Sequence, residues 1–109
     1  MALIFKKRYI NPIIRGEKTV TRRASRPMVK PGGIYRLRMG FFNYMPDRIR
    51  VHRLYTQRLD EMTPEDAVKE GVSSLEEFRR DWAEIYGPWD GDQRVWVVEF
   101  EYVGPHRKP

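Results

Sequence analysis

Eight residues near the N-terminus read Gly16-Glu17-Lys18-Thr19-Val20-Thr21-Arg22-Arg23. They follow the short apolar pair Ile13-Ile14, and a glycine in this place is typical of the end of a helix. The next residues, Thr19-Val20-Thr21, are β-branched throughout, which favours an extended strand. The segment therefore predicts a corner between a helix and a strand, from which side chains can point into a cleft.

Alternating and capping patterns predict the other elements. Strands are expected over residues 3–5, 34–39, 48–55 and 94–103, the last three because apolar and polar side chains alternate along them. A proline after a capping residue is a common helix start, and it predicts helices that begin at Asn11-Pro12 and at Thr63-Pro64. A further helix is expected from Ser74, the first residue of a capping box with Glu77, to Tyr86 before Gly87-Pro88.

The chain of 109 residues has room for one core only, so we expect a single domain over residues 1–109. The predicted order of elements indicates the α+β class. Strands in so short a chain would close most economically into a small β-barrel flanked by short helices. Residues 104–109 are expected to form a flexible tail.

Composition excludes several classes of protein. The sequence contains no cysteine, which rules out disulfides, thiolate metal sites and cysteine nucleophiles. The two histidines, His52 and His106, are far apart, so we expect no metal site and no cofactor. No apolar stretch is long enough to span a membrane, and Lys6-Lys7-Arg8 follows the first apolar residues, the reverse of the order in a signal peptide. We therefore expect a cytoplasmic protein without membrane contact.

Charge is divided unevenly along the chain. Residues 1–58 contain 15 Lys and Arg but only two acidic residues, whereas residues 59–109 contain 6 Lys and Arg and 13 acidic residues. A strongly positive face would suit an anionic partner such as RNA. The alternative is that the two halves neutralise each other across the fold.

The basic half also supplies candidates for contact with nucleic acid. Aromatic side chains in the expected loop over residues 40–46 could stack on bases, or could instead close the barrel as a hydrophobic plug. The apolar stripe from Leu75 to Tyr86, which includes Trp82, is interpreted as core packing. The candidate nucleic-acid-binding residues are Lys18, Arg22, Arg23, Arg26, Arg36, Arg38, Phe41 and Tyr44.

The pattern Gly-x-Lys-Thr-x-Thr-x-Arg after a short helix resembles the ASCH domain of the PUA-like superfamily. The resemblance continues in the second half of the chain, in Glu70-Gly71, in residues 74–78, in Trp82 with Tyr86-Gly87, and in the strand over residues 97–100. It implies a PUA-like barrel with a cleft that faces RNA or a nucleotide. In one branch, the small N4-acetylcytidine amidohydrolases, a lysine and a threonine of this motif act with a later glutamate, and these correspond to Lys18, Thr21 and Glu70.

The chemistry of these three residues permits catalysis but does not require it. A threonine hydroxyl needs a neighbouring base to attack a carbonyl, and Lys18 could serve if burial or nearby cations lowered its pKa. Glu70 could then carry a proton to the leaving amine. Each residue also has an ordinary interpretation: a phosphate-binding lysine, a β-branched strand residue and a glutamate at a helix end. Three functions therefore stay open, namely binding of RNA or a modified nucleoside, amide hydrolysis of N4-acetylcytidine, and a protein-binding adaptor.

Overall fold

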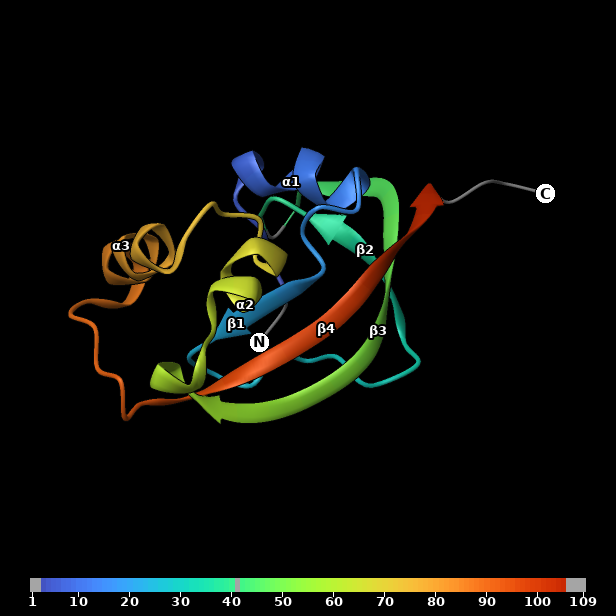
Figure 1. The fold of residues 1–109 in the computed structure, drawn as a ribbon. Coiled ribbons are helices and arrows are strands. Elements are labelled where there is room, and N and C mark those ends of the chain that lie inside the picture. Colours follow the sequence, from blue (N-terminus) through green and yellow to red (C-terminus); the bar gives the residue numbers. More distant parts are fainter. Residues whose placement is uncertain (1–2, 41, 106–109) are drawn as a thin grey trace.

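The computed structural model describes residues 3–40 and 42–105. Four strands form one antiparallel sheet in the order β1-β4-β3-β2. Figure 1 shows β3 and β4 as long curved strands side by side, with α2 and α3 toward the end at which β4 begins. The elements are α1 (Lys7–Ile14), β1 (Val20–Arg23), β2 (Ile34–Arg38), β3 (Tyr44–Arg58), a 3-10 turn (Leu59–Glu61), α2 (Pro64–Lys69), α3 (Leu75–Tyr86) and β4 (Arg94–Pro105).

This architecture confirms the α+β class but not the expected barrel. β1 and β2 lie at the two edges of the described sheet, and each pairs with one neighbour only. The edge strands are short, four and five residues, whereas β3 and β4 have 15 and 12. The long β3–β4 pair therefore dominates the sheet, and the sheet stays open.

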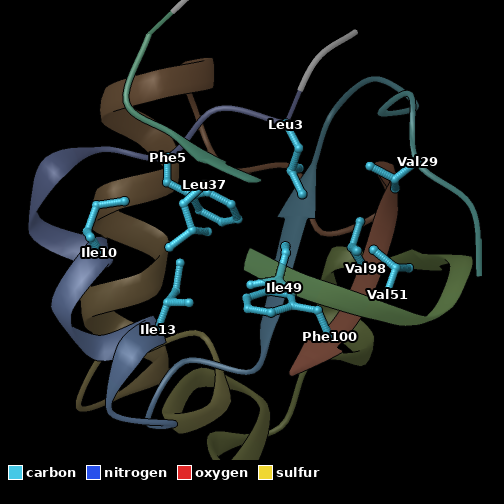
Figure 2. Close-up of a cluster of buried hydrophobic side chains, with 10 residues drawn as sticks. All are labelled: Leu3, Phe5, Ile10, Ile13, Val29, Leu37, Ile49, Val51, Val98 and Phe100. Atoms are coloured by element: carbon cyan, nitrogen blue, oxygen red, sulfur yellow. The ribbon is translucent and has the colours of Figure 1, made fainter. Parts of the chain in front are cut away.

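Helix α1 begins at Lys7, so the predicted start at Asn11-Pro12 is wrong, and Pro12 lies inside the helix. The earlier start places Ile10 and Ile13 on one face, where both are buried. Figure 2 shows the two isoleucines pointing from α1 toward the side chains of the sheet. Burial of each isoleucine stabilises the fold by about 1.5–3 kcal/mol, which offsets the roughly 3 kcal/mol that an internal proline costs.

Three other boundaries differ from the predictions. Residues 3–5 are not a strand: Phe5 donates one backbone hydrogen bond to the carbonyl of Arg38 at 2.9 Å, and the chain then enters α1. β3 begins at Tyr44, which shortens the expected aromatic loop. β4 runs to Pro105, so residues 104 and 105 belong to the sheet, and residues 106–109 lie outside the described residues.

The predicted caps of the later helices are confirmed. The hydroxyl of Thr63 accepts a hydrogen bond from the Asp66 amide at 3.2 Å, and that of Ser74 accepts one from the Glu77 amide at 3.1 Å. The Glu77 carboxylate binds the amide of Ser73 rather than that of Ser74, so the capping box is incomplete. These caps place the start of each helix at the residue that the sequence indicates.

The core consists of two hydrophobic clusters. The first lies between α1 and the sheet and includes Phe5, Val98 and Phe100. The second lies beneath α2 and α3 and includes Trp82 and Val95. β4 thus supplies buried side chains to both clusters, whereas the sequence predicted one buried face for it.

No helix within residues 3–40 and 42–105 is long and apolar enough to cross a membrane.

Candidate functional site

Four polar side chains are buried among the described residues: Lys18, Thr21, Arg22 and Glu70, each 3–4% exposed. Lys18 lies in the corner between α1 and β1, Thr21 and Arg22 lie in β1, and Glu70 is the C-cap residue of α2. Charged side chains are seldom fully buried unless they are paired. The corner that the sequence singles out is therefore an internal site and not a surface feature.

The backbone at this corner is held from two sides. Gly16 has φ +77° and ends α1, and the amide of Lys18 donates to the carbonyl of Pro12 at 3.1 Å. The next amide, that of Thr19, donates to the carbonyl of Lys69 in α2 at 2.8 Å. These bonds fix Lys18 beside the C-terminus of α2.

Gly71 lets the two segments approach closely. It has φ +92°, and a Cβ atom added there would lie 3.2 Å from Cβ of Lys18. A side chain at this position would strain the backbone and crowd the lysine. Gly71 therefore both ends α2 and leaves room for the Lys18 side chain.

The ammonium group of Lys18 has three acceptors. Its Nζ atom donates to the carbonyls of Val20 and Glu70, at 2.9 and 2.8 Å, and to Oε1 of Glu70 at 3.2 Å. The ring of Tyr9 covers the same ammonium, with its centroid 4.7 Å from Nζ. Since an ammonium has three N–H donors, Lys18 is fully satisfied in this arrangement.

Glu70 joins two cations. Its second oxygen, Oε2, accepts from Nη1 of Arg22 at 2.9 Å. Arg22 also donates to the side-chain oxygen of Gln57 at 2.9 and 3.1 Å and lies 3.6 Å from the Asp66 carboxylate. The guanidinium of Arg22, a predicted nucleic-acid contact, is thus held by other side chains within the fold.

Burial lowers the pKa of Lys18, because a charged ammonium is poorly solvated there. The Glu70 carboxylate opposes this change, and the nearby cations Arg23 and Arg22 add to it. Lys18 therefore releases a proton more readily than an exposed lysine. A lowered pKa is what the sequence analysis required for Lys18 to act as a base.

Thr21 is oriented by its neighbour on β1. Its Oγ1 atom accepts a hydrogen bond from Nε of Arg23 at 3.2 Å, and the Arg23 guanidinium lies over the Phe5 ring at 5.0 Å. Within the described residues no hydrogen bond joins Thr21 to Lys18. The threonine hydroxyl keeps its own proton available for another acceptor.

These side chains line a pocket of about 180 Å³ between the two hydrophobic clusters. Lys18, Thr21, Arg22, Arg23 and Glu70 form its polar part. Its other walls, which sequence reasoning did not assign to a site, include Phe5, Tyr9, Phe78, Asp81, Trp82, Ile85 and Tyr86.

One sequence feature indicated this side of the pocket: the apolar stripe of α3 continues to the last two residues of the helix. Ile85 and Tyr86 continue the apolar stripe, yet they are 48% and 41% exposed. The stripe is therefore longer than the core beneath it needs, and its end faces the pocket. Tyr9 and Asp81 offered no comparable signal, because their pairing depends on how α1 packs against α3.

Tyr9 and Asp81 connect those two helices. The Tyr9 hydroxyl donates to the Asp81 carboxylate at 3.0 Å, and Arg8 pairs with the same carboxylate at 3.3 Å. Burial, followed by the hydrogen bond and the charge of Asp81, raises the pKa of Tyr9 to about 12. The tyrosine that covers the Lys18 ammonium is therefore itself held in place.

The other predicted nucleic-acid contacts lie away from this pocket. Arg26 lies over the ring of Trp96 at 5.0 Å. Arg36 and Arg38 both lie over the ring of Tyr44, at 5.3 and 4.3 Å, beside a separate hollow.

Phe41 lies outside the described residues.

Part of the positive charge is neutralised by the acidic half of the chain. Arg50 pairs with Glu101 at 3.3 Å and Arg53 with Glu99 at 3.0 Å, both across β3 and β4. Within residues 3–40 and 42–105, no group of three His, Asp or Glu side chains is placed to hold a metal ion.

Replacement of Glu70 should destabilise the protein more than replacement of its partner. Glu70→Gln leaves the buried cations Lys18 and Arg22 without their shared carboxylate, and breaking such a pair costs about 3–5 kcal/mol. Lys18→Met leaves the Arg22–Glu70 pair intact and should cost less. The free energies of unfolding in urea measure this order. Glu65→Gln, on the exposed surface of α2, is the control, and an equal loss in Glu70→Gln and Glu65→Gln would contradict the pairing.

Tyr9 should titrate abnormally. Its pKa of about 12 should fall toward 10 in Asp81→Asn, because the charge of its hydrogen-bond partner is removed while its burial remains. The folded protein keeps this proton above pH 10, where the unfolded chain releases it, so the associated stability is complete below pH 10 and is lost as the pH rises toward 12. NMR titration of the tyrosine Cζ resonances measures the pKa, and Asp92→Asn is the control. An unchanged Tyr9 pKa in Asp81→Asn would refute the assignment.

No family model matches the sequence, and no curated protein matches it. The structure is similar to the ASCH domain of Lactobacillus crispatus, with a TM-score of 0.60 and 17% identity over 86% of this chain and 69% of that one. A variant of ZmASCH from Zymomonas mobilis matches with a TM-score of 0.66 and 13% identity, over 97% of this chain and 71% of that one.

A protein of Enterococcus faecalis matches with a TM-score of 0.66 and 18% identity, over 94% of this chain and 74% of that one. At such identities the likeness concerns the arrangement of the backbone. It agrees with the resemblance that the sequence motif suggests. The chain therefore has the fold of an ASCH domain.

Proposed function

We propose that the pocket binds a single base of a modified nucleoside, either free or presented by RNA. The observation that carries this proposal is the burial of Lys18, Thr21 and Glu70 at the polar end of a pocket with aromatic walls. Charged groups are costly to bury, and pockets that hold such groups are where ligands are bound and converted. The likeness to an ASCH domain is consistent with a ligand-binding pocket, and it does not identify the ligand.

The size of the pocket favours a base over a length of polymer. Its volume of about 180 Å³ is below the range of roughly 300–1,000 Å³ for pockets that enclose drug-sized ligands. Among the aromatic walls, Tyr86 is 41% exposed and can stack on a base, and the polar end can bind the hydrogen-bonding edge of that base. A base that leaves its stack and enters such a pocket would be recognised both by stacking and by hydrogen bonds to its edge.

The basic residues outside the pocket support contact with RNA less directly. Arg22 is engaged within the fold, and Arg36 and Arg38 cover another hollow beside Tyr44. Arg23 lines the pocket and is the predicted cation best placed near a bound nucleotide. We therefore assign recognition to the pocket and leave to the surface arginines only a contribution to the attraction of RNA.

Binding of N4-acetylcytidine and cytidine should depend on Thr21. Thr21→Val keeps the shape of the side chain and removes its hydroxyl, which should weaken binding about five- to ten-fold, the usual value of one hydrogen bond. Isothermal titration calorimetry measures the affinity. Thr56→Val, on an exposed part of β3, makes the same chemical change outside the pocket and should bind as the unaltered protein does. Binding of RNA alone, with a steep salt dependence and no binding of either nucleoside, would refute the pocket proposal.

A second candidate function is hydrolysis of the N4-acyl amide of cytidine. It is favoured by the lowered pKa of Lys18 together with the presence of Thr21 and Glu70 in the same pocket. The neutral amine of Lys18 would take the hydroxyl proton while Thr21 Oγ1 forms a bond to the acyl carbon. The C–N bond would then break, the departing amine would receive a proton by way of Glu70, and water would release the acyl group from Thr21.

Turnover should require the Thr21 hydroxyl and an unprotonated Lys18. Thr21→Ala should reduce the release of cytidine and acetate from N4-acetylcytidine by at least about 100-fold, the scale expected when a nucleophile is lost. The rate should rise with pH as Lys18 loses its proton, up to its lowered pKa. Chromatography of both products follows the reaction, with Thr56→Ala as the control. An undiminished rate in Thr21→Ala would exclude this mechanism, and absence of turnover with intact binding would leave recognition as the function.

A further inference from the structure

The guanidinium of Arg23 has donors that the fold leaves unused. Its Nε atom donates to Oγ1 of Thr21 at 3.2 Å, and the group lies over the Phe5 ring at 5.0 Å. Its two terminal nitrogens have no hydrogen-bond or ion-pair partner among the described residues, and neither of them is sealed from solvent. A guanidinium is a fork of N–H donors, so Arg23 keeps the outer edge of that fork for another acceptor.

The charge of Arg23 lies among residues of the pocket wall. Burial lowers the pKa of Arg23, and the electrostatic influence of Tyr86, Glu70 and Tyr9 raises it. All three of these residues line the pocket, as Arg23 itself does. Since arginine keeps its proton in proteins, the pocket holds a positive charge at this place.

Lys6 is a second cation of the pocket wall without an acidic partner. Its side chain is exposed, and it forms no ion pair within residues 3–40 and 42–105. It directly follows Phe5, on whose ring the Arg23 guanidinium lies. The backbone therefore brings Lys6 to the segment that Arg23 covers.

The pocket has more positive than negative charge. Its wall contains four cations and two carboxylates, namely Lys6, Lys18, Arg22 and Arg23 against Glu70 and Asp81. Glu70 is bound by Lys18 and Arg22. Asp81 is bound by Tyr9 and Arg8. The formal surplus of two positive charges therefore belongs to Arg23 and Lys6, which favours an anionic ligand.

We propose that Arg23 and Lys6 bind a phosphate group of the ligand, so that the pocket selects a nucleotide over the corresponding nucleoside. This inference rests on the proposed function: the base enters the pocket, and its phosphate lies at the rim between the guanidinium and the exposed ammonium. A planar guanidinium binds two phosphate oxygens at once, and a flexible lysine adds a point charge. Two positive charges match a phosphate monoester, which carries nearly two negative charges, better than they match a carboxylate. A free mononucleotide and the backbone of RNA both supply a phosphate group, and they are separated below.

Isothermal titration calorimetry on the full chain compares N4-acetylcytidine and cytidine with their 5′- and 3′-monophosphates. At least one monophosphate should bind about ten- to one-hundred-fold more tightly than its nucleoside, the scale of a hydrogen bond to a charged group. This gain should shrink as sodium chloride is added, because salt screens the charges, whereas nucleoside binding should change little. A trinucleotide with the same nucleoside at its centre and no terminal phosphate is the RNA arm. A gain there, with none for the monophosphates, assigns the phosphate site to the RNA backbone.

Variants connect the gain to the two cations. The measured quantity is the ratio of nucleotide to nucleoside affinity within each protein, because contacts that both ligands share cancel in this ratio. Arg23→Gln should remove most of the gain, and Arg23→Lys should keep part of it because the charge remains. Lys6→Gln should reduce the ratio about two- to five-fold, as expected for an exposed charge. Lys7→Gln makes the same change of charge one residue further on, at an exposed position outside the pocket, and should keep the full ratio.

The failure of the phosphate site and that of the proposed function give different results. A ratio near one for every phosphate-bearing ligand, or a full gain in both Arg23→Gln and Lys6→Gln, would refute the phosphate site, while binding of the nucleosides would leave the proposed function standing. If ribose 5-phosphate binds as tightly as the nucleotides, the base is not recognised and the proposed function fails. If neither nucleosides nor nucleotides bind, both fail.

Discussion

A buried ammonium group governs this structure. The buried Lys18 side chain has a carboxylate and two carbonyls as its hydrogen-bond partners, and these come from β1 and from the end of α2. This need for acceptors brings Lys18 and Glu70 together, although they are 52 positions apart in the sequence. It also explains Gly71, whose missing side chain leaves the space that Lys18 occupies. The corner, the helix end and the pocket are therefore parts of a single arrangement.

The two hydrophobic clusters give that arrangement its surroundings. Phe5 belongs to the cluster beneath α1, whereas Phe78 and Trp82 belong to the one beneath α2 and α3, and all three line the pocket. The pocket lies where the clusters meet, so its apolar walls are extensions of the core. The burial of Lys18 follows from this position and is the main cause of its lowered pKa. Folding and the chemistry of the site thus depend on the same packing.

Local patterns predicted much of the chain correctly. Thr63 and Ser74 cap their helices, and Gly16 and Gly71 end helices with positive φ, because each of these features depends on a few neighbouring residues. The predictions failed where distant packing decided the outcome. The sequence predicted that α1 begins at Asn11-Pro12, but the helix begins at Lys7, which buries Ile10. A barrel was expected, but the edge strands are short and the sheet is open.

For the site, the sequence by itself determined which segment matters and which side chains are chemically able: Lys18 and Thr21 in the motif, and Glu70 before its glycine. Only the tertiary structure decided that these three share a pocket, that Arg22 is buried beside Glu70, and that Tyr9 and Trp82 form walls. The physical reason is that burial and pairing are properties of surfaces from different elements. Residue type and spacing describe one element at a time, whereas the pocket exists only where α1, β1, α2 and α3 meet.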